Sequence, residues 1–247
     1  MWSYSQRIGC GNGEKRRKAL FGSNRTHEKA VQFAEKYGIE KVYDNIDQVF
    51  EDENVDIIYI STPHNTHIEF LRKALKAGKH VLCEKSITLN SEELEEAINL
   101  AKENNVVLAE AMTIYHMPIY KKLNEIISSG KLGDLGLIQM NFGSYKEYDM
   151  TNRFFNRNLA GGAMLDIGVY ALSFVRWFMT SVPDQVVSQV KMAPTGWMNR
   201  QEFYLKIKKR KWQRLCFRFT ASNLNAEQSL LTRDILKSLN IQEGRKQ

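Results

Sequence analysis

One nearly continuous run of β-branched and apolar residues, Val55-Asp56-Ile57-Ile58-Tyr59-Ile60-Ser61, sets the strongest limit on how this chain can fold. Such a run is typical of a strand buried on both faces, as the strands of a parallel sheet are. Thr62-Pro63 follows and ends the strand, because proline has no N–H for the ladder of backbone hydrogen bonds. The run therefore predicts a parallel sheet.

Strand and helix patterns alternate between residues 26 and 110. Thr26 is a suitable cap for a helix that Gly38 ends, and Gly78 closes a second helix in the same way. This alternation with short loops is typical of βαβ units, so we predict an α/β domain over residues 1–112. The predicted helices are 26–37, 46–50, 65–77 and 91–104, the last capped at Ser91, and the predicted strands are 41–43, 55–61, 79–84 and 106–110.

The pattern changes after Met112, which indicates a second, α+β domain over residues 113–247. We predict a helix from Pro118 to Ser129, an antiparallel strand over 137–145 and an apolar helix over 163–179. Residues 197–247 look atypical, because they lack hairpin signals and 205–218 is a cluster of Lys and Arg. We therefore expect only a partial second domain, in which helix 163–179 lacks the cover of a sheet.

The net charge of +7 lies entirely in the two ends of the chain. Residues 1–24 carry a net charge of +4, residues 25–196 one of −5 and residues 197–247 one of +8. Basic segments interleaved with aromatic residues suit single-stranded nucleic acid, so nucleic-acid binding through the termini stays one alternative.

Three scattered cysteines, Cys10, Cys83 and Cys216, form no CxxC pair and no metal-ligand spacing. This pattern predicts a reduced, cytoplasmic protein with no metal site. No apolar run approaches the length of a transmembrane helix, and the first residues lack the apolar stretch of a signal peptide. We therefore expect no membrane partner.

Polar residues follow three of the predicted strands, at the carboxyl ends where parallel sheets bind ligands. They are Ser61-Thr62-Pro63-His64-Asn65-Thr66-His67, Glu84-Lys85-Ser86 and Glu110-Ala111-Met112. A lysine beside a glutamate at a strand end can donate a proton or orient a hydroxyl. The alternative for Glu84 and Lys85 is a pair of surface charges.

Asp166 and Tyr170 lie four residues apart near the start of the apolar helix, so they share a face. Gly161-Gly162 before them allows the backbone to approach a ligand closely. The alternative is an acidic residue at a solvent-facing helix N-terminus, where the helix dipole favours it.

Taken together, three segments resemble the glucose–fructose oxidoreductase/inositol dehydrogenase (Gfo/Idh/MocA) family, in the branch of the dihydrodiol dehydrogenases. They are 61–67, Glu84-Lys85 and 160–170, and the likeness runs from about Ser23 to Gly196. The resemblance implies an N-terminal Rossmann domain and a C-terminal domain whose open sheet serves substrate binding and oligomer contacts. It implies an NAD(P)-dependent oxidoreductase for a sugar, polyol or diol, and a homo-oligomer for a full-length version.

The resemblance also assigns roles to single residues. Lys85 matches the lysine of a Glu-Lys-Pro motif that binds the substrate hydroxyl and relays its proton, with Ser86 in place of the proline. Asp166 matches an aspartate that contacts the substrate, and Tyr170 stands where the family has its acid/base. A lysine near the tyrosine lowers the pKa of its phenol, which helps it accept a proton.

The cofactor implied by the resemblance is NADP or NAD. Thr62, Pro63, Asn65 and His67 match the loop under the cofactor, and Arg25 matches the position that binds a 2′-phosphate in NADP-preferring members. The full predicted site comprises the catalytic residues Lys85, Asp166 and Tyr170 and the cofactor-binding residues Arg25, Thr62, Pro63, Asn65, His67, Glu84 and Lys85.

Both ends depart from the family pattern. Gly9-Cys10-Gly11-Asn12-Gly13-Glu14 has no strand before it and lies too close to Arg25, so we interpret this glycine cluster as chance and expect the first βα unit to be largely missing. After about residue 196, back-translation in a shifted frame restores family-like sequence, so we hypothesise a frameshift there. The predicted fold is an incomplete Rossmann-like domain followed by a partial α+β domain, with impaired activity. A non-catalytic, small-molecule-binding remnant is the other alternative.

Overall fold

The computed structural model describes residues 27–39, 41–145, 152–192, 198–207 and 210–220 of the chain. The chain divides into two compact units, Met1–Met112 and Thr113–Gln247. Each unit has its own sheet, its own helices and its own apolar core.

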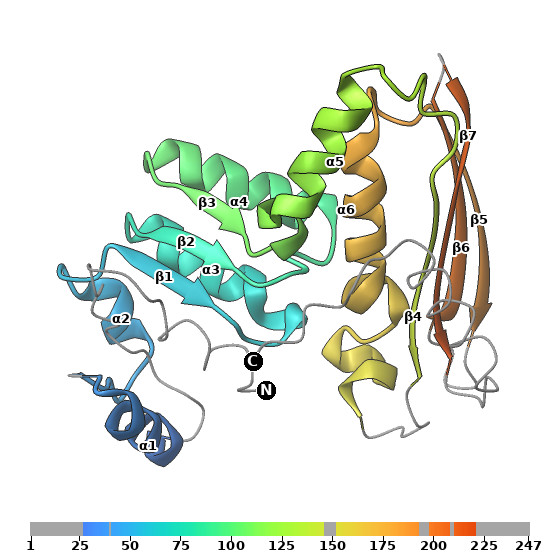
Figure 1. Cartoon of the computed structure of the whole chain (residues 1–247). Helices are drawn as coiled ribbons and strands as arrows, with labels where there is room; N and C mark the ends of the chain where they lie inside the picture. The colour runs from blue at the N-terminus through green and yellow to red at the C-terminus, as the bar shows by residue number, and fades with distance from the viewer. Residues whose placement is uncertain (1–26, 40, 146–151, 193–197, 208–209, 221–247) are drawn as a thin grey trace. The chain divides into compact units, whose positions relative to one another are not determined.

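The first unit is built on a parallel sheet, as the alternation of patterns predicted. Strands β1 (Ile57–Ile60), β2 (His80–Cys83) and β3 (Leu108–Glu110) lie in the order β1-β2-β3, and all point the same way (Figure 1). Helix α3 (His67–Lys76) joins β1 to β2, and α4 (Ser91–Glu103) joins β2 to β3. The prediction of βαβ units is therefore confirmed.

The shorter elements of the first unit agree with the sequence in part. Helices α1 (His27–Tyr37) and α2 (Asp47–Glu51) confirm the predicted ones, while the proposed cap of α1, Thr26, lies outside the described residues. The predicted strand 41–43 is wrong, because only Val42 forms a single bridge there. A short run of that kind carries too few residues to settle between strand and loop.

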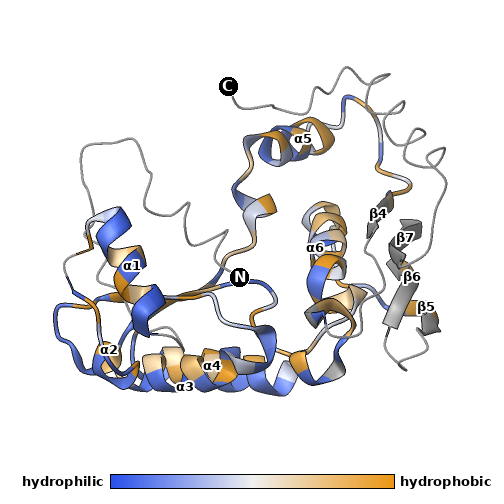
Figure 2. Ribbon diagram, turned by 90° about the horizontal axis from the view of Figure 1, so that it is seen from below, coloured by the Kyte–Doolittle hydropathy of each residue, from blue (hydrophilic) through white to orange (hydrophobic). Residues whose placement is uncertain are grey.

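The core of the first unit lies between the sheet and helices α3 and α4, which lie side by side (Figure 2). Each buried aliphatic side chain contributes roughly 1.5–3 kcal/mol, so this layer fixes the sheet firmly. Ile60 is 3% exposed, whereas Ile57 at the start of β1 is 54% exposed. Burial therefore increases along β1 toward its carboxyl end, and the expected burial of the whole strand on both faces is wrong. The core consists of Phe50, Ile60, Leu71, Ala74, Leu75, Val81, Cys83, Ala97 and Ala101.

Helix α4 begins with a cap that differs from the predicted one. The Asn90 side chain, rather than that of Ser91, accepts the Glu93 N–H at 2.8 Å. Glu93 in turn accepts the Leu89 N–H at 3.0 Å, so the two side chains satisfy backbone donors on both sides of the helix start. This cap fixes the segment that returns from the end of β2.

The second unit contains a four-stranded sheet in the order β4-β7-β6-β5. Strands β5, β6 and β7 pair antiparallel, but β4 pairs parallel with β7, so the prediction of an antiparallel strand over 137–145 is wrong. Two of these strands fall in the segment that we expected to build no sheet, and that expectation is also wrong. The strands are β4 (Gln139–Tyr145), β5 (Gln185–Met192), β6 (Met198–Ile207) and β7 (Arg210–Thr220).

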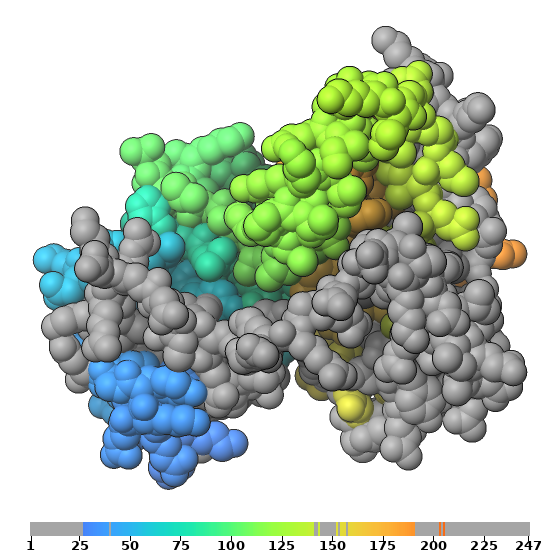
Figure 3. All heavy atoms as spheres, viewed as in Figure 1, coloured from blue at the N-terminus to red at the C-terminus, as the bar shows by residue number. Residues whose placement is uncertain are grey.

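Two helices accompany this sheet. Helix α5 (Pro118–Ser128) confirms its prediction and lies on the surface of its unit (Figure 3). The predicted helix 163–179 is present, but it starts with a π-helical turn, Met164–Gly168, before α6 (Val169–Phe178). Short 3₁₀ turns occur at His64–Thr66, Thr113–His116, Arg153–Phe155 and Arg157–Leu159. None of the helices in the described ranges has the length and apolar character needed to cross a membrane.

Helix α6, coloured mainly orange in Figure 2, is covered by the sheet. Its Val175, 1% exposed, and Phe178 share a core with Phe203 and Leu205 of β6. Alternation along β6 places these two apolar residues on the buried face, although the surrounding sequence is basic. The expectation that helix 163–179 lacks its cover is therefore wrong.

Candidate active site

The carboxyl ends of the three parallel strands meet at one edge of the first sheet. Ile60 of β1 pairs with Cys83 of β2, and Cys83 pairs with Glu110 of β3. The residues that follow, 61–67 and 84–87, therefore start from neighbouring points. This edge brings together six of the site residues that we predicted from the sequence. They are Thr62, Pro63, Asn65, His67, Glu84 and Lys85.

Glu84 is held at this edge by two contacts. The Tyr59 hydroxyl donates to Oε1 of Glu84, and the Lys85 N–H donates to Oε2 at 3.3 Å. The side chain of Lys85 is half-buried, and the peptide bond between Lys85 and Ser86 is cis. Glu84 therefore contributes to the backbone geometry beside Lys85. Tyr59 was not among the predicted site residues, because its reach to Glu84 depends on the pairing of β1 with β2.

His67 is fully buried and lies between the two strand-end loops. Its Nδ1 lies 2.8 Å from the Ser86 carbonyl oxygen, and its Nε2 lies 2.8 Å from the Thr62 carbonyl oxygen. Burial lowers the pKa of His67, while the contacts with the two carbonyls act in the opposite direction. Both ring nitrogens face backbone carbonyls, so the imidazole ties the loops to each other, and the role of His67 in the cofactor-binding loop stays a prediction.

Glu110 is a site residue to which the sequence interpretation gave no role. Its Oε1 accepts the Ile87 N–H at 3.0 Å, which links the end of β3 to the loop that carries Lys85. Burial raises the pKa of Glu110, with a further upward contribution from Glu84, whereas the Ile87 N–H and the charge of Lys85 lower it. The only sequence signal was its position directly after an expected strand.

The loop after β1 has a defined turn and one buried hydroxyl. Thr66 donates to the Pro63 carbonyl through its N–H at 2.9 Å and its hydroxyl at 2.8 Å. The Thr62 Oγ1 is buried, and within the described part of the chain it has no hydrogen-bond partner. A buried hydroxyl that makes no hydrogen bond lowers stability by about 1–3 kcal/mol. A hydrogen bond to a polar group of a bound ligand removes this penalty, so the Thr62 hydroxyl suits such a ligand. Thr62, Pro63 and half-buried Asn65 therefore fit the predicted cofactor loop, and Arg25 lies outside the described residues.

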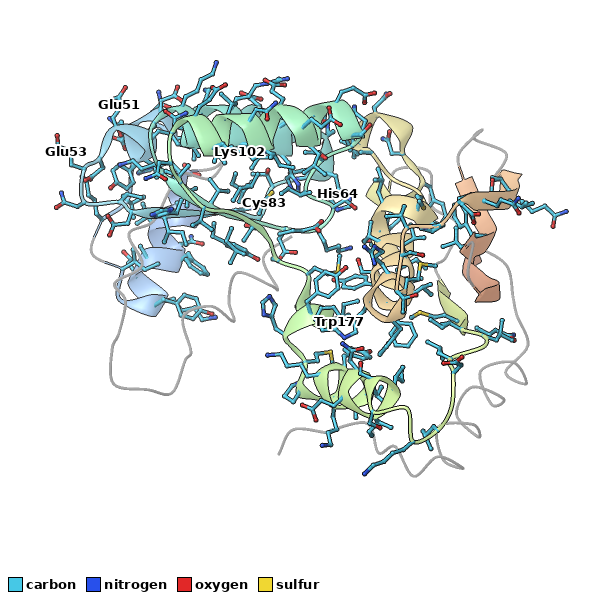
Figure 4. The ribbon with its side chains drawn as sticks, turned by 90° about the horizontal axis from the view of Figure 1, so that it is seen from above. Glu51, Glu53, His64, Cys83, Lys102 and Trp177 are labelled. Carbon is cyan, nitrogen blue, oxygen red and sulfur yellow. The ribbon has the colours of Figure 1, made fainter. Side chains whose placement is uncertain are left out.

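Cys83 and His64, both labelled in Figure 4, lie at the same end of the sheet. Cys83 is a free cysteine with no exposed surface, and burial raises the pKa of its thiol well above the usual range. A thiol that stays protonated is a poor nucleophile. Cys83 therefore belongs to the core, and the chemistry of this edge rests on oxygen and nitrogen groups.

Asp166 and Tyr170 lie at the start of the long helix of the second unit. Asp166 belongs to the π-helical turn and Tyr170 to the first turn of α6, and both side chains are half-buried. Gly162, with φ +98°, stands before them in a conformation that favours glycine, and its carbonyl accepts the Asp166 N–H at 3.3 Å. π-Helical turns are common at functional sites. Lys85 belongs to the other unit, so its pairing with Tyr170 stays a prediction.

The parallel sheet with polar strand ends, followed by a separate unit in which helices cover a sheet, defines a two-domain protein of the Rossmann type. The chain belongs to the Gfo/Idh/MocA oxidoreductase family. The model of the family's oxidoreductase domain with the NAD-binding Rossmann fold matches residues 10–112, and the model of its C-terminal domain matches residues 120–213.

Known proteins of similar sequence and structure agree with this assignment. The chain is 33% identical over 170 residues to a trans-1,2-dihydrobenzene-1,2-diol dehydrogenase from Xenopus tropicalis, covering 68% of this chain and 51% of that protein. It is 36% identical over 143 residues to a D-xylose 1-dehydrogenase (NADP(+)) from Hypocrea jecorina, covering 55% of this chain and 37% of that protein. The crystal structure of an aldose-aldose oxidoreductase from Caulobacter crescentus superposes with a TM-score of 0.75 at 26% identity, covering 82% of this chain and 63% of that one. The chain spans about half the length of the dihydrodiol dehydrogenases that it matches.

The family match is longer at both ends than the expected range of Ser23 to Gly196. It begins at Cys10, so part of the glycine cluster lies inside it, and it continues to residue 213, through β6. The family match thus extends past the proposed boundary at residue 196, and the frameshift hypothesis stays a prediction. Residues 1–26 lie outside the described ranges, and the loss of the first βα unit stays a prediction.

Proposed function

We propose that this chain is an NAD(P)-dependent oxidoreductase that acts on a hydroxyl of a sugar, polyol or diol. The observation that carries the proposal is the placement of Lys85, directly after β2, in a loop that side chains from β1, α3 and β3 hold in place. The carboxyl end of a parallel sheet is where such folds bind their ligands. The named activities of the dihydrodiol and D-xylose dehydrogenases support this substrate class.

Oxidation of an alcohol requires the loss of a hydride from carbon and of a proton from oxygen. The nicotinamide ring supplies the hydride acceptor when the cofactor is bound. In our proposal the Lys85 ammonium binds and orients the substrate hydroxyl, the Tyr170 phenolate accepts its proton, and Asp166 contacts a further substrate hydroxyl. A neighbouring ammonium lowers the pKa of a phenol, which favours its role as the base.

The cofactor in this proposal is NADP or NAD. Thr62, Pro63 and Asn65 lie under it, with the buried Thr62 hydroxyl as the group that fits a polar atom of the ligand. His67 holds this loop in place, and Arg25 pairs with the 2′-phosphate of NADP. The similarity to a D-xylose 1-dehydrogenase (NADP(+)) supports the same preference.

Titration of the purified full chain with NADPH and NADH, followed by protein fluorescence, tests the proposal directly. We expect saturable binding in the micromolar range, tighter for NADPH, and an Arg25→Ala variant that loses this preference. Reduction of NADP or NAD is then measured with a panel of aldoses, polyols and trans-dihydrodiols. The proposal is overturned if the chain binds neither NADPH nor NADH. If it binds a cofactor but turns over no member of the panel, a small-molecule-binding protein is favoured instead.

Two further properties belong to the same proposal. Cys83 is a free, buried thiol, and this supports a reduced, cytoplasmic protein. Family members use the open sheet of the second domain for oligomer contacts, so we propose a homo-oligomer for a full-length version. Sedimentation of the purified protein measures its assembly state.

A further inference from the structure

Side chains fix the backbone of the loop that carries Lys85 at several points. The sheet ladder still includes Glu84, whose N–H donates to the Ile60 carbonyl at 2.8 Å. In the residues beyond Glu84, the Ser86 carbonyl lies against His67, and the Ile87 N–H donates to Glu110. Because Ser86 and Ile87 directly follow Lys85, these contacts determine where the Lys85 side chain starts.

We propose that Glu110 is a positioning residue for Lys85, which acts by holding the Ile87 N–H and so the backbone that directly follows the lysine. The proposal rests on the function proposed above for Lys85. Glu110 acts through the loop backbone, and it takes no part in the transfer of hydride or proton. The family match covers its position, but the proposed role comes from the geometry alone.

The position of Glu110 suits this role, because it stands on a rigid element. It is the last residue of β3 and pairs with Cys83 of β2, whose carbonyl accepts the Ala111 N–H at 2.7 Å. A group on a strand holds its geometry better than one on a loop. A hydrogen bond to a carboxylate is also stronger than one between neutral groups. Glu110 therefore transmits the rigidity of β3 to the residues after Lys85.

Two neighbouring charges act on the Glu110 carboxyl in opposite directions. Of the ionisable groups whose charges act on its carboxyl, Lys85 is cationic and favours the ionised form, whereas Glu84 is anionic and opposes it. Glu84 is in turn occupied by the Tyr59 hydroxyl and the Lys85 N–H. Glu110 thus offers a carboxylate to the loop backbone, and the charge of Lys85 favours its ionised form.

Amide hydrogen exchange at Ile87, measured by NMR on the full chain, tests the contact without any assay of activity. In Glu110→Ala the N–H loses its acceptor, and we expect its exchange to be about tenfold or more faster, the scale of one lost hydrogen bond. Glu110→Gln keeps an acceptor oxygen, so its exchange stays near wild type. The matched control is Glu103→Ala, an exposed glutamate at the end of α4, with unchanged exchange at Ile87.

Kinetics then test the link to Lys85. We expect kcat to fall about tenfold or more in Glu110→Ala, with partial rescue in Glu110→Gln, and the dissociation constant of NADPH to stay within about twofold. A purely structural role would lower thermal stability and leave kcat of the folded variant unchanged. Unchanged exchange at Ile87, or unchanged kcat in folded Glu110→Ala, overturns the proposal.

The experiments also remain decisive if the wild-type chain is inactive or if Glu110→Ala does not fold. If the wild-type chain turns over no substrate, the proposed function fails, while the exchange at Ile87 still decides whether Glu110 holds the loop. If Glu110→Ala does not fold, Glu110→Asp replaces it, because a carboxylate one methylene shorter keeps the charge and loses the reach to Ile87. Faster exchange in Glu110→Asp than in Glu110→Gln supports positioning, and equal exchange overturns it.

Discussion

The sheets of the two units differ in how far apart along the chain their paired strands lie. In the first unit each strand pairs with the next one, and one helix joins them. In the second unit β4 pairs with β7, so that Gln139 lies opposite Arg214. Local patterns of apolar residues therefore determine the first sheet, whereas the second depends on contacts between distant segments.

The candidate residues are also held in two different ways. At the strand ends of the first unit, His67, Glu84 and Glu110 reach from separate elements to the loop around Lys85. In the second unit Asp166 and Tyr170 lie on consecutive turns of one helical segment, and Gly162 sets its entry. The first arrangement depends on the register of the sheet, and the second on local helix geometry.

The largest effect that we predict tests whether β6, which lies in the basic segment 197–247, contributes to the core of the second unit. Phe203 of β6 is 9% exposed and packs with Val175 and Phe178, so Phe203→Ala should lower the free energy of unfolding by about 3–5 kcal/mol. Val187→Ala on β5, where the side chain is 55% exposed, serves as control and should change it by less than about 0.5 kcal/mol. Urea denaturation measures both values.

A loss of stability in Phe203→Ala no larger than that in Val187→Ala would contradict the structure of β6. The second unit would then have no core contributed by the residues after position 197. The expected losses in the free energy of unfolding differ clearly between Phe203→Ala and Val187→Ala. A buried phenylalanine removes several-fold more apolar surface from water than an exposed valine does.

The next prediction joins the two units. We expect Lys85→Ala and Tyr170→Phe each to lower kcat by about 10²-fold or more, the usual scale of acid–base groups. If both act on the same hydroxyl proton, the double variant loses less than the product of the two single losses. Steady-state kinetics on the three variants measure this coupling, with Lys102→Ala, a lysine in the last turn of α4, as the control with unchanged kcat.

Independent, multiplicative losses would instead place the two residues in separate roles. Activity that survives Tyr170→Phe would assign the proton transfer to the first unit alone. Either result decides whether the helix start in the second unit shares the chemistry of the strand ends in the first.

The sequence predicted those features that rest on neighbouring residues. The helices α1, α3 and α5 follow from apolar spacing with a glycine or proline at an end, and β1 follows from its β-branched run. The pairing of β4 with β7 has no local signal, since register between distant segments appears in neither one alone. The bond from Ile87 to Glu110 was missed for the same reason. The cap at Asn90 was missed by one residue, because asparagine and serine are both good caps.

The smallest effect concerns the pH dependence of stability at the strand ends. Burial raises the pKa of Glu110 in the folded chain above its value in the unfolded chain. At a pH below the unfolded value both states are protonated, and Glu110 then adds no ionisation penalty to folding. As the pH rises, the unfolded state loses its proton first, so the free energy of unfolding decreases through this window.

Glu110→Gln removes that dependence, because glutamine does not ionise. We therefore expect the free energy of unfolding of Glu110→Gln, relative to wild type, to increase as the pH rises from the ordinary pKa of a glutamate through the raised pKa of Glu110 in the folded chain. Urea denaturation at several pH values measures it, and a difference that shrinks as the pH rises would contradict the prediction. Glu110 in its ionised form would then lower the stability of the fold while it holds the loop of Lys85, which is the pattern of a residue whose position serves function rather than stability.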